Sequence, residues 1–142
     1  MPRPILNHVS LGVADLARAR AFYDAALAPL GITEQYVVDP GEGPVAVAYG
    51  DGYPELWVQL PENRAPASVG NGAHVALTAT SEEAVDAFHA AAVKAGGADG
   101  GPPGKRPHYG PDYYGAFVRD PDGNKIEAVY MGSMAMLGGD TT

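Results

Sequence analysis

The 142-residue sequence contains no cysteine, which excludes disulfide bonds, thiolate nucleophiles and cysteine-ligated metal sites. Positive charge is also scarce: nine lysine and arginine residues stand against 17 aspartate and glutamate residues, a net charge of −8. Nucleic-acid-binding proteins normally present a basic surface, so the sequence predicts no nucleic-acid partner. No apolar run approaches the roughly 18 residues of a membrane span, and the first residues form no hydrophobic leader. We therefore expect a cytoplasmic protein without membrane association.

The composition is that of a globular protein. Apolar residues make up 46% of the chain, which at this length is enough for one hydrophobic core. The 19 glycines and 13 prolines indicate many turns between short elements. A single domain is the expectation.

An internal repeat divides this domain. Residues 8–31 align with residues 74–97 without a gap, at an offset of 66 residues, and eight of the 24 aligned positions are identical. Abundant alanine inflates that count, but it does not explain the matching histidines His8 and His74. Self-similarity at a fixed offset predicts two copies of one structural unit. We expect the following segments: a first module at about 4–60, a linker at 61–72, a second module at about 73–131 and a flexible tail at 132–142.

Each module begins with a strand pattern and continues with a helix pattern. Residues 5–13 and 73–80 alternate with period two, and in residues 81–96 apolar side chains recur at helical spacing. Asp15 is the expected N-cap of the first helix, and the Thr80–Glu83 capping-box pattern is expected to start the second. Gly31 and the pair at 96–97 would end them. Further strands are predicted at 32–38, 44–50, 54–60, 97–100, 112–119 and 125–131, with an irregular loop at 100–111.

The resulting fold class is α+β, with two tandem βαβββ modules and mostly antiparallel sheet. In both first strands the apolar side chains share one face, and a histidine followed by small residues lies on the other. A strand buried on both faces would carry bulky residues on both. Small residues beside His8 and His74 therefore indicate a cavity wall.

Two histidines and a carboxylate on one cavity wall predict a divalent-metal site. Glu127 lies in the middle of the last predicted strand between apolar residues, where an unpaired carboxylate would be unfavourable. A His₂–carboxylate set suits one Fe, Zn, Mn, Ni or Co ion. Two alternatives stay open: the histidines could be hydrogen-bonded core residues, and Glu127 could pair with Lys125 or Arg119. His89, on the apolar stripe of the second helix, is better explained by core packing.

Several segments carry a family resemblance. They are LNHVSLGV at 6–13, the Asp15-Leu pair followed by AFY at 21–23, GAHVAL at 72–77 and AFVRDPDGNKIEA at 116–128. With these segments the chain, over about residues 4–131, resembles the vicinal oxygen chelate superfamily. That superfamily includes glyoxalase I, fosfomycin-resistance proteins, methylmalonyl-CoA epimerase, extradiol dioxygenases and bleomycin-resistance proteins.

The resemblance implies paired modules that curve into a half-open barrel around a metal ion. It implies His8, His74 and Glu127 as ligands and Glu55 as the candidate fourth ligand. Gln59 shares a face with Glu55 and is an alternative, and the fourth position could also be empty. In glyoxalase-like chemistry a ligating carboxylate can act as the base, which would make Glu127 or Glu55 catalytic.

Aromatic side chains are expected around this metal. Trp57, Tyr113 and Phe117 are predicted to line the substrate pocket. His108, on the preceding loop with Lys105, Arg106 and Tyr109, could close over an anionic substrate, or the loop could simply be solvated.

The expected function is that of a metal-dependent lyase, isomerase or dioxygenase-like enzyme acting on a small oxygen-rich molecule. The alternative is a metal-free binding protein of the bleomycin-resistance type. Exposed sheet edges favour a homodimer. Whether the site forms within one chain or across a dimer is left open by the sequence.

Overall fold

The structure, a computed structural model, describes residues 2–132. The predicted flexible tail, apart from Gly132, lies outside the described residues. The first module contains β1 (Val9–Gly12), α1 (Leu16–Leu27), a 3-10 turn (Ala28–Leu30), β2 (Thr33–Val38), β3 (Ala46–Gly50) and β4 (Leu56–Gln59). The second contains β5 (Val75–Thr78), α2 (Glu82–Lys94), β6 (Ala98–Lys105), β7 (Tyr113–Arg119) and β8 (Lys125–Met131). The α+β class and the repeated βαβββ order are confirmed.

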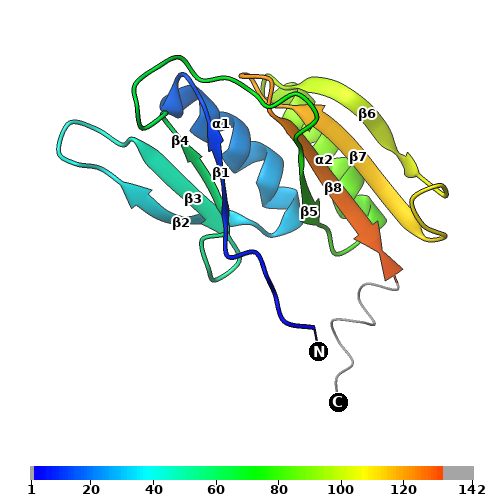
Figure 1. The fold of residues 1–142 in the computed structure, drawn as a ribbon. Helices are drawn as coiled ribbons and strands as arrows, with labels where there is room; N and C mark the ends of the chain where they lie inside the picture. The colour runs from blue at the N-terminus through cyan, green and yellow to red at the C-terminus, as the bar shows by residue number, and fades with distance from the viewer. Residues whose placement is uncertain (1, 133–142) are drawn as a thin grey trace.

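The two modules have the same sheet topology (Figure 1). The strand orders are β1-β4-β3-β2 and β5-β8-β7-β6. In each module the first strand pairs in parallel with the last, and the other neighbours are antiparallel. The sheets are not closed into a barrel, which agrees with the predicted half-open architecture.

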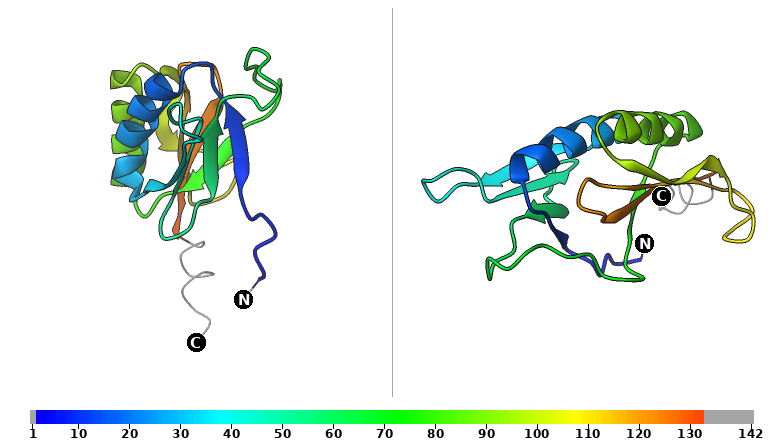
Figure 2. Two further views of the ribbon diagram at one scale, coloured as in Figure 1. Left: turned by 90° about the vertical axis from the view of Figure 1, so that its left-hand side faces the viewer. Right: turned by 90° about the horizontal axis from the view of Figure 1, so that it is seen from above.

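Both helices cover the same side of the two sheets and contact each other (Figure 2). Their apolar faces pack on the sheets in one continuous core, in which Phe22 of α1 and Phe88 of α2 are buried. Within residues 2–132, no helix covers the opposite side of the sheets (Figure 2), so the strand residues that point there are the ones available for a site. In the described part of the chain, no helix has the length and apolar character needed to cross a bilayer.

The helix starts follow local capping rules. Asp15 caps α1 as predicted, accepting a hydrogen bond from the Arg18 amide at 3.1 Å. The prediction of Thr80 as the start of α2 is wrong by one residue: Ser81 Oγ accepts from the Ala84 amide at 3.0 Å. Gly31 ends the first helical segment with φ of 74°, a conformation that favours glycine.

Strand β6 differs from the prediction, which ended a strand at residue 100 and placed an irregular loop at 100–111. The strand continues to Lys105 through a Gly-Gly-Pro-Pro-Gly stretch. It lies at the outer edge of its sheet and its pairing with β7 shifts register twice, between Asp99 and Gly101 and between Gly101 and Gly104. An edge position with bulges tolerates prolines because the missing N–H groups are not needed by a neighbour. Pairing with β7 therefore overrides the local preference for a loop.

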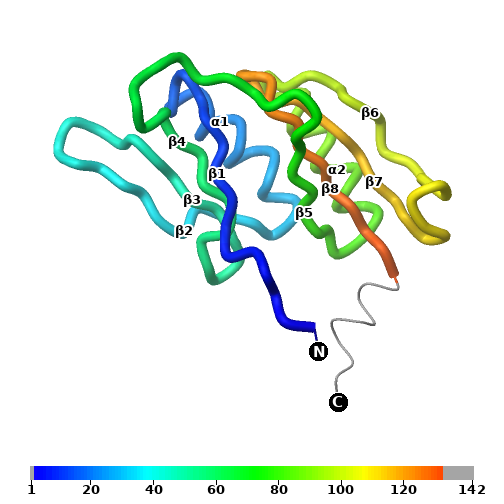
Figure 3. The backbone as a smooth tube through the Cα atoms, viewed as in Figure 1, coloured from blue at the N-terminus to red at the C-terminus, as the bar shows by residue number. Residues whose placement is uncertain are grey.

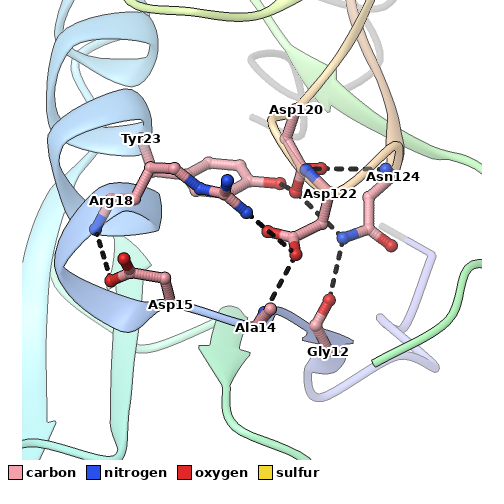
Figure 4. Close-up of polar contacts among 8 residues, drawn as sticks. All are labelled: Gly12, Ala14, Asp15, Arg18, Tyr23, Asp120, Asp122 and Asn124. Carbon is pink, nitrogen blue, oxygen red and sulfur yellow. Dashed lines mark hydrogen bonds and ion pairs between the residues drawn. The ribbon is translucent and has the colours of Figure 1, made fainter. Parts of the chain in front are cut away.

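A polar network joins the modules where the β7–β8 turn reaches α1 (Figure 4). The Tyr23 hydroxyl donates to Asp120 Oδ2 at 2.6 Å, and Asn124 Nδ2 donates to the same oxygen at 2.9 Å and to the Gly12 carbonyl at 3.0 Å. Asp122 Oδ1 accepts from the Ala14 amide at 2.9 Å. Burial and the neighbouring Asp120 hold the pKa of Tyr23 well above its usual range, so the phenol remains a donor.

Candidate functional site

The helix-free face of the second sheet carries a buried carboxylate with two partners. Ile126 and Ala128 of β8 point into the core, so Glu127 between them points to the opposite face. Its carboxylate is 1% exposed. Glu127 Oε1 lies 3.1 Å from His74 Nε2, and Oε2 accepts a short hydrogen bond from the Tyr113 hydroxyl. Both oxygens are thus satisfied, as a buried carboxylate requires.

Tyr113 acts as a protonated donor in this His74–Glu127–Tyr113 cluster. Burial raises the pKa of its hydroxyl, and the hydrogen bond to Glu127 and that residue's charge raise it further. Arg106 opposes this rise with its positive charge. The imidazole of His74 is the most accessible part of the cluster, with 40% of its side chain exposed. A ligand on this face would therefore meet His74 first.

Gly115 makes room for the cluster. It lies between Tyr113 and Phe117 on the same face of β7, and a Cβ at this position would be 3.1 Å from Glu127 Oε2 and 3.2 Å from Tyr113 Cε1. The sequence prediction included Tyr113 and Phe117 but missed the role of Gly115. The signal was present in the alternation of aromatic, glycine and aromatic residues along the strand.

Phe117 lies at the centre of the second module's face. It is opposite Glu127 in the β7–β8 register, and its ring centroid is 5.8 Å from that of His74. Lys125 Nζ lies 4.9 Å from the Phe117 centroid, and Arg106 Cζ lies 5.8 Å from it. The Phe117 ring thus lies next to one imidazole and two cationic side chains.

The first module contributes a separate aromatic group on its helix-free face. His8 is exposed, its Nδ1 lies 2.7 Å from Asn7 Oδ1, and its ring centroid is 6.4 Å from that of Trp57. Tyr36 packs edge-on against Trp57 at 6.1 Å. Asn7 also donates to the Tyr53 hydroxyl at 2.9 Å. The sequence prediction named His8 and Trp57 but not Tyr36, Asn7 or Tyr53, because nothing in the repeat distinguishes them.

The remaining predicted residues lie around these two groups. Glu55 is exposed just before β4 and lines a hollow of about 320 Å³ with residues that include Asp51 and Thr78. Gln59, the alternative to Glu55, is half-buried near the linker. His108 is exposed and stacks on Tyr109, with ring centroids 4.1 Å apart.

His89 lies apart from the two histidines of the predicted metal site. Its side chain is 17% exposed, and its Nε2 lies 2.9 Å from Asp99 Oδ1. The sequence predicted core packing for His89, whereas the side chain lies partly buried between α2 and β6 and pairs with a carboxylate.

A hollow of about 290 Å³ connects the modules between the facing edges of β1 and β5. Ser10 and Gly12 line it from β1, Ser68 from the linker, and His74 and Lys125 from the second module. Figure 3 shows the linker passing from the end of β4 to β5, along one side of this junction. The accessible part of the His74 cluster therefore opens toward the first module.

His74 and Glu127 suit two neighbouring positions around a metal ion. Ligands about 2.1 Å from one ion and roughly at right angles are about 3 Å apart, close to the 3.1 Å between Nε2 and Oε1. Neutral imidazole and ionised carboxylate are also the donor types that Zn and Fe accept. Among residues 2–132, however, no group of three or more His, Asp or Glu side chains could hold a metal ion. The larger set of His8, His74, Glu127 and Glu55 stays a prediction.

Comparison with known proteins gives a family match over most of the chain. The family described as the Glyoxalase/Bleomycin resistance protein/Dioxygenase superfamily matches residues 5–128. No curated protein matches the chain.

Solved structures give matches over most of the chain. A glyoxalase/bleomycin resistance protein from Albidiferax ferrireducens is 39% identical, with a TM-score of 0.76 over 89% of this chain and 98% of its own. A glyoxalase-related enzyme from Fulvimarina pelagi is 23% identical, with a TM-score of 0.63 over 88% and 86%. TnmS3, an antibiotic binding protein from a Streptomyces species, is 20% identical, with a TM-score of 0.58 over 93% and 99%. The last two show likeness of fold alone.

Proposed function

Because the chain belongs to the glyoxalase/bleomycin resistance protein/dioxygenase superfamily, we propose that it is a metal-dependent enzyme acting on a small oxygen-rich molecule. The supporting observation is the buried Glu127, whose Oε1 lies 3.1 Å from the partly exposed His74 imidazole. His74 and Glu127 would hold the metal together with His8 and Glu55. These two residues would come from the first module of the same chain or of the partner in a dimer.

Such a metal supplies Lewis acidity toward a substrate oxygen. Within the chain, Glu127 is the proposed base, because it is the buried carboxylate on the substrate-facing side of the sheet. Tyr113 orients that carboxylate through its hydroxyl, and Phe117 excludes water from one side of it. Trp57 and His108 would contact more distant parts of the substrate.

Metal content tests the proposal. The wild-type protein is dialysed in turn against Fe, Mn, Ni and Zn, and bound metal is measured by plasma emission. We expect about one ion per site in the wild type and loss of the ion in His74→Ala and Glu127→Gln. His89→Ala is the matched control, because His89 also pairs with a carboxylate but lies away from the cluster. Wild-type protein that retains no ion with any of the four metals would contradict the proposal.

Metal-free binding of an aromatic ligand is the second candidate function. The observation that favours it is the aromatic group of Trp57, Tyr36 and His8 on the helix-free face, together with the fold likeness to an antibiotic binding protein. Trp57 is the only tryptophan in the sequence, so its fluorescence reports on this surface. Saturable quenching by bleomycin that a chelator leaves unchanged would favour the binder. Absence of quenching would exclude bleomycin as its ligand.

We also propose a homodimer, in which the outer strand β2 takes part. Tyr36, Val37 and Val38 of this strand are exposed, and an unpaired edge with apolar side chains favours association. Light scattering should give about twice the chain mass of 14.7 kDa. A mass near that of one chain at micromolar concentration would contradict the dimer.

A further inference from the structure

Two cations flank Phe117 beside the His74 cluster, and neither has a carboxylate partner in the described part of the chain. We propose that Arg106 and Lys125 form an anion-binding site there, so that the substrate carries a carboxylate or phosphate group. This inference deepens the proposed function and, for the identity of the substrate, rests on it.

The placement of the two cations follows from the strands. Lys125 and Glu127 are two residues apart on β8, and their side chains therefore point to the same helix-free face. Arg106 follows β6 directly, and its side chain turns back toward Phe117. Both cations approach the Phe117 ring to within the distance of a cation–π contact. They therefore share one location with the cluster.

The cations remain available to a ligand. Ion pairs among residues 2–132 involve Arg18, Arg20, His74, His89 and Lys105 and do not include Arg106 or Lys125. The chain carries 17 acidic residues and a net charge of −8, so two unpaired cations at one place are unexpected. Of the three charged groups that contacts place at Phe117 and the cluster, Arg106 and Lys125 are cationic and Glu127 is anionic. The two cations would attract an anion.

Arg106 is held in position by backbone atoms. Its Nη1 donates to the Gly104 carbonyl at 3.0 Å and its Nη2 to the Pro102 carbonyl at 2.7 Å. A Cβ at Gly101 would come within 3.4 Å of Nη2, and one at Gly104 within 3.3 Å of Nη1. The glycines of β6 thus leave the space in which the guanidinium lies.

A guanidinium has five N–H groups, and these two bonds leave three for a ligand. A fixed guanidinium binds an anion with little loss of side-chain entropy.

The space beside Lys125 limits the size of the anion. The hollow lined by Lys125, His74, Ser10 and Ser68 measures about 290 Å³. That is the lower end of the range for small-molecule sites, roughly 300–1,000 Å³. A small organic anion fits this space, with its charged group at Lys125 on the side of Phe117 and Arg106, and its other oxygens toward His74.

Matched probes that differ in charge test the inference. Phenylglyoxylate and phenyl phosphate serve as anions, and methyl phenylglyoxylate serves as the neutral counterpart of the first. Affinities are measured by calorimetry and by amide chemical shifts on chelator-treated wild-type protein. We expect an anion to bind at least about tenfold more tightly than the ester, since a hydrogen bond to a charged group has this effect. The anion that binds with the higher affinity shows whether the site prefers a carboxylate or a phosphate group.

Substitutions test whether the preference for an anion over the ester comes from Arg106 and Lys125. Arg106→Met and Lys125→Met should each reduce anion affinity about tenfold and leave ester affinity unchanged. Lys94→Met, which removes an exposed lysine at the end of α2, should change neither. Equal affinity for anion and ester, no binding of any probe, or wild-type affinity in both variants would overturn the inference.

Metal content separates this result from the proposed function. Arg106→Met and Lys125→Met should retain the metal content of the wild type, because neither residue is a proposed ligand. Anion preference in a protein that binds no metal would refute the proposed function and leave the anion site standing.

Discussion

Gly115 controls the space around the buried carboxylate. Any side chain there must displace Glu127 Oε2 or the Tyr113 ring, which lie 3.1 and 3.2 Å from the added Cβ. Neither group can move easily, because Glu127 is buried and Tyr113 is bonded to it. The geometry of His74 and Glu127 therefore depends on a residue without a side chain.

Gly115→Ala should separate Tyr113 from Glu127 and weaken metal or ligand binding at His74. We expect a loss of about 1–3 kcal/mol in the free energy of unfolding, typical of overpacking. Urea denaturation measures the loss, and plasma emission or calorimetry measures the binding. Gly110→Ala is the matched control, because its added Cβ would be 3.7 Å from Tyr113 Cβ, an ordinary contact. Wild-type binding in Gly115→Ala would show that the Tyr113 bond is dispensable.

The His89–Asp99 pair makes a prediction about pH. The hydrogen bond from His89 lowers the pKa of Asp99, helped by the Gly101 amide. His89→Ala should raise this pKa toward the ordinary value near 3.9, measured by NMR of the side-chain carboxyl carbon. In the same spectra Glu34, whose pKa Arg20 lowers, should not change.

The sign of the stability effect follows from the lowered pKa. Stabilisation by the His89–Asp99 pair is present above the unfolded pKa of Asp99 and is lost as the pH falls through the folded value. The variant should therefore lose less stability on acidification than the wild type. An unchanged Asp99 titration would show that the contact does not form in solution.

Single residues of the site were predictable where a strand pattern constrained them. His74 and Glu127 were predicted because both interrupt an apolar alternation, and the structure brings them within 3.1 Å. Asn7 was not predicted as a site residue, because its side-chain hydrogen bonds depend on Tyr53, which lies 46 residues later in the chain. Arg106 was predicted as a loop residue that could close over an anionic substrate, but its position beside Phe117 was not predicted, because that position depends on the extension of β6.

Among the helices, the N-caps give a direct stability prediction. Asp15→Ala and Ser81→Ala each remove an oxygen that accepts from a first-turn amide. Each variant should lower the free energy of unfolding by about 1 kcal/mol, measured by urea denaturation. Thr80→Ala is the control that separates the observed cap from the one expected from the sequence. A larger loss in Thr80→Ala than in Ser81→Ala would restore Thr80 as the cap.

Among the strands, β6 shows why local sequence was insufficient. Glycine and proline disfavour strands by propensity, and the stretch at 100–104 contains only these two residue types. The strand nevertheless forms because β7 supplies pairing partners on both sides of the two prolines, and the register shifts between them absorb the mismatch. Partner strands far along the chain are not visible in a local pattern.

The placement of the modules depends on contacts that are not repeated. Tyr23 aligns with His89 at the 66-residue offset, so the Tyr23–Asp120 bond has no second copy. The repeat therefore predicted the fold of each module but not how the two modules sit against each other. That arrangement depends on the polar network of Figure 4 and on the contact of the two helices.

Tyr23→Phe should loosen this junction. The change leaves the buried Asp120 with one partner fewer and should lower the free energy of unfolding by about 1–3 kcal/mol. Amide hydrogen exchange should become faster at the β7–β8 turn and at the start of α1. Tyr49→Phe is the matched control, since Tyr49 is also buried and bonded to an aspartate, Asp24, but within one module. Equal exchange at the turn in both variants would refute a junction role.

The two outer edge strands differ in how readily they can pair with a strand of another molecule. β1 and β5 face each other across the junction, so β2 and β6 are the outward edges. β6 carries Pro102 and Pro103 and two register shifts, which make it a poor template for a further strand. β2 has one register shift, between Glu34 and Tyr36, and pairs without interruption from Tyr36 to Val38, so it is the edge more open to a neighbouring strand. In the proposed dimer, two copies joined through β2 would each have used that edge, so the sheet would end at a pair and would not grow into a fibril.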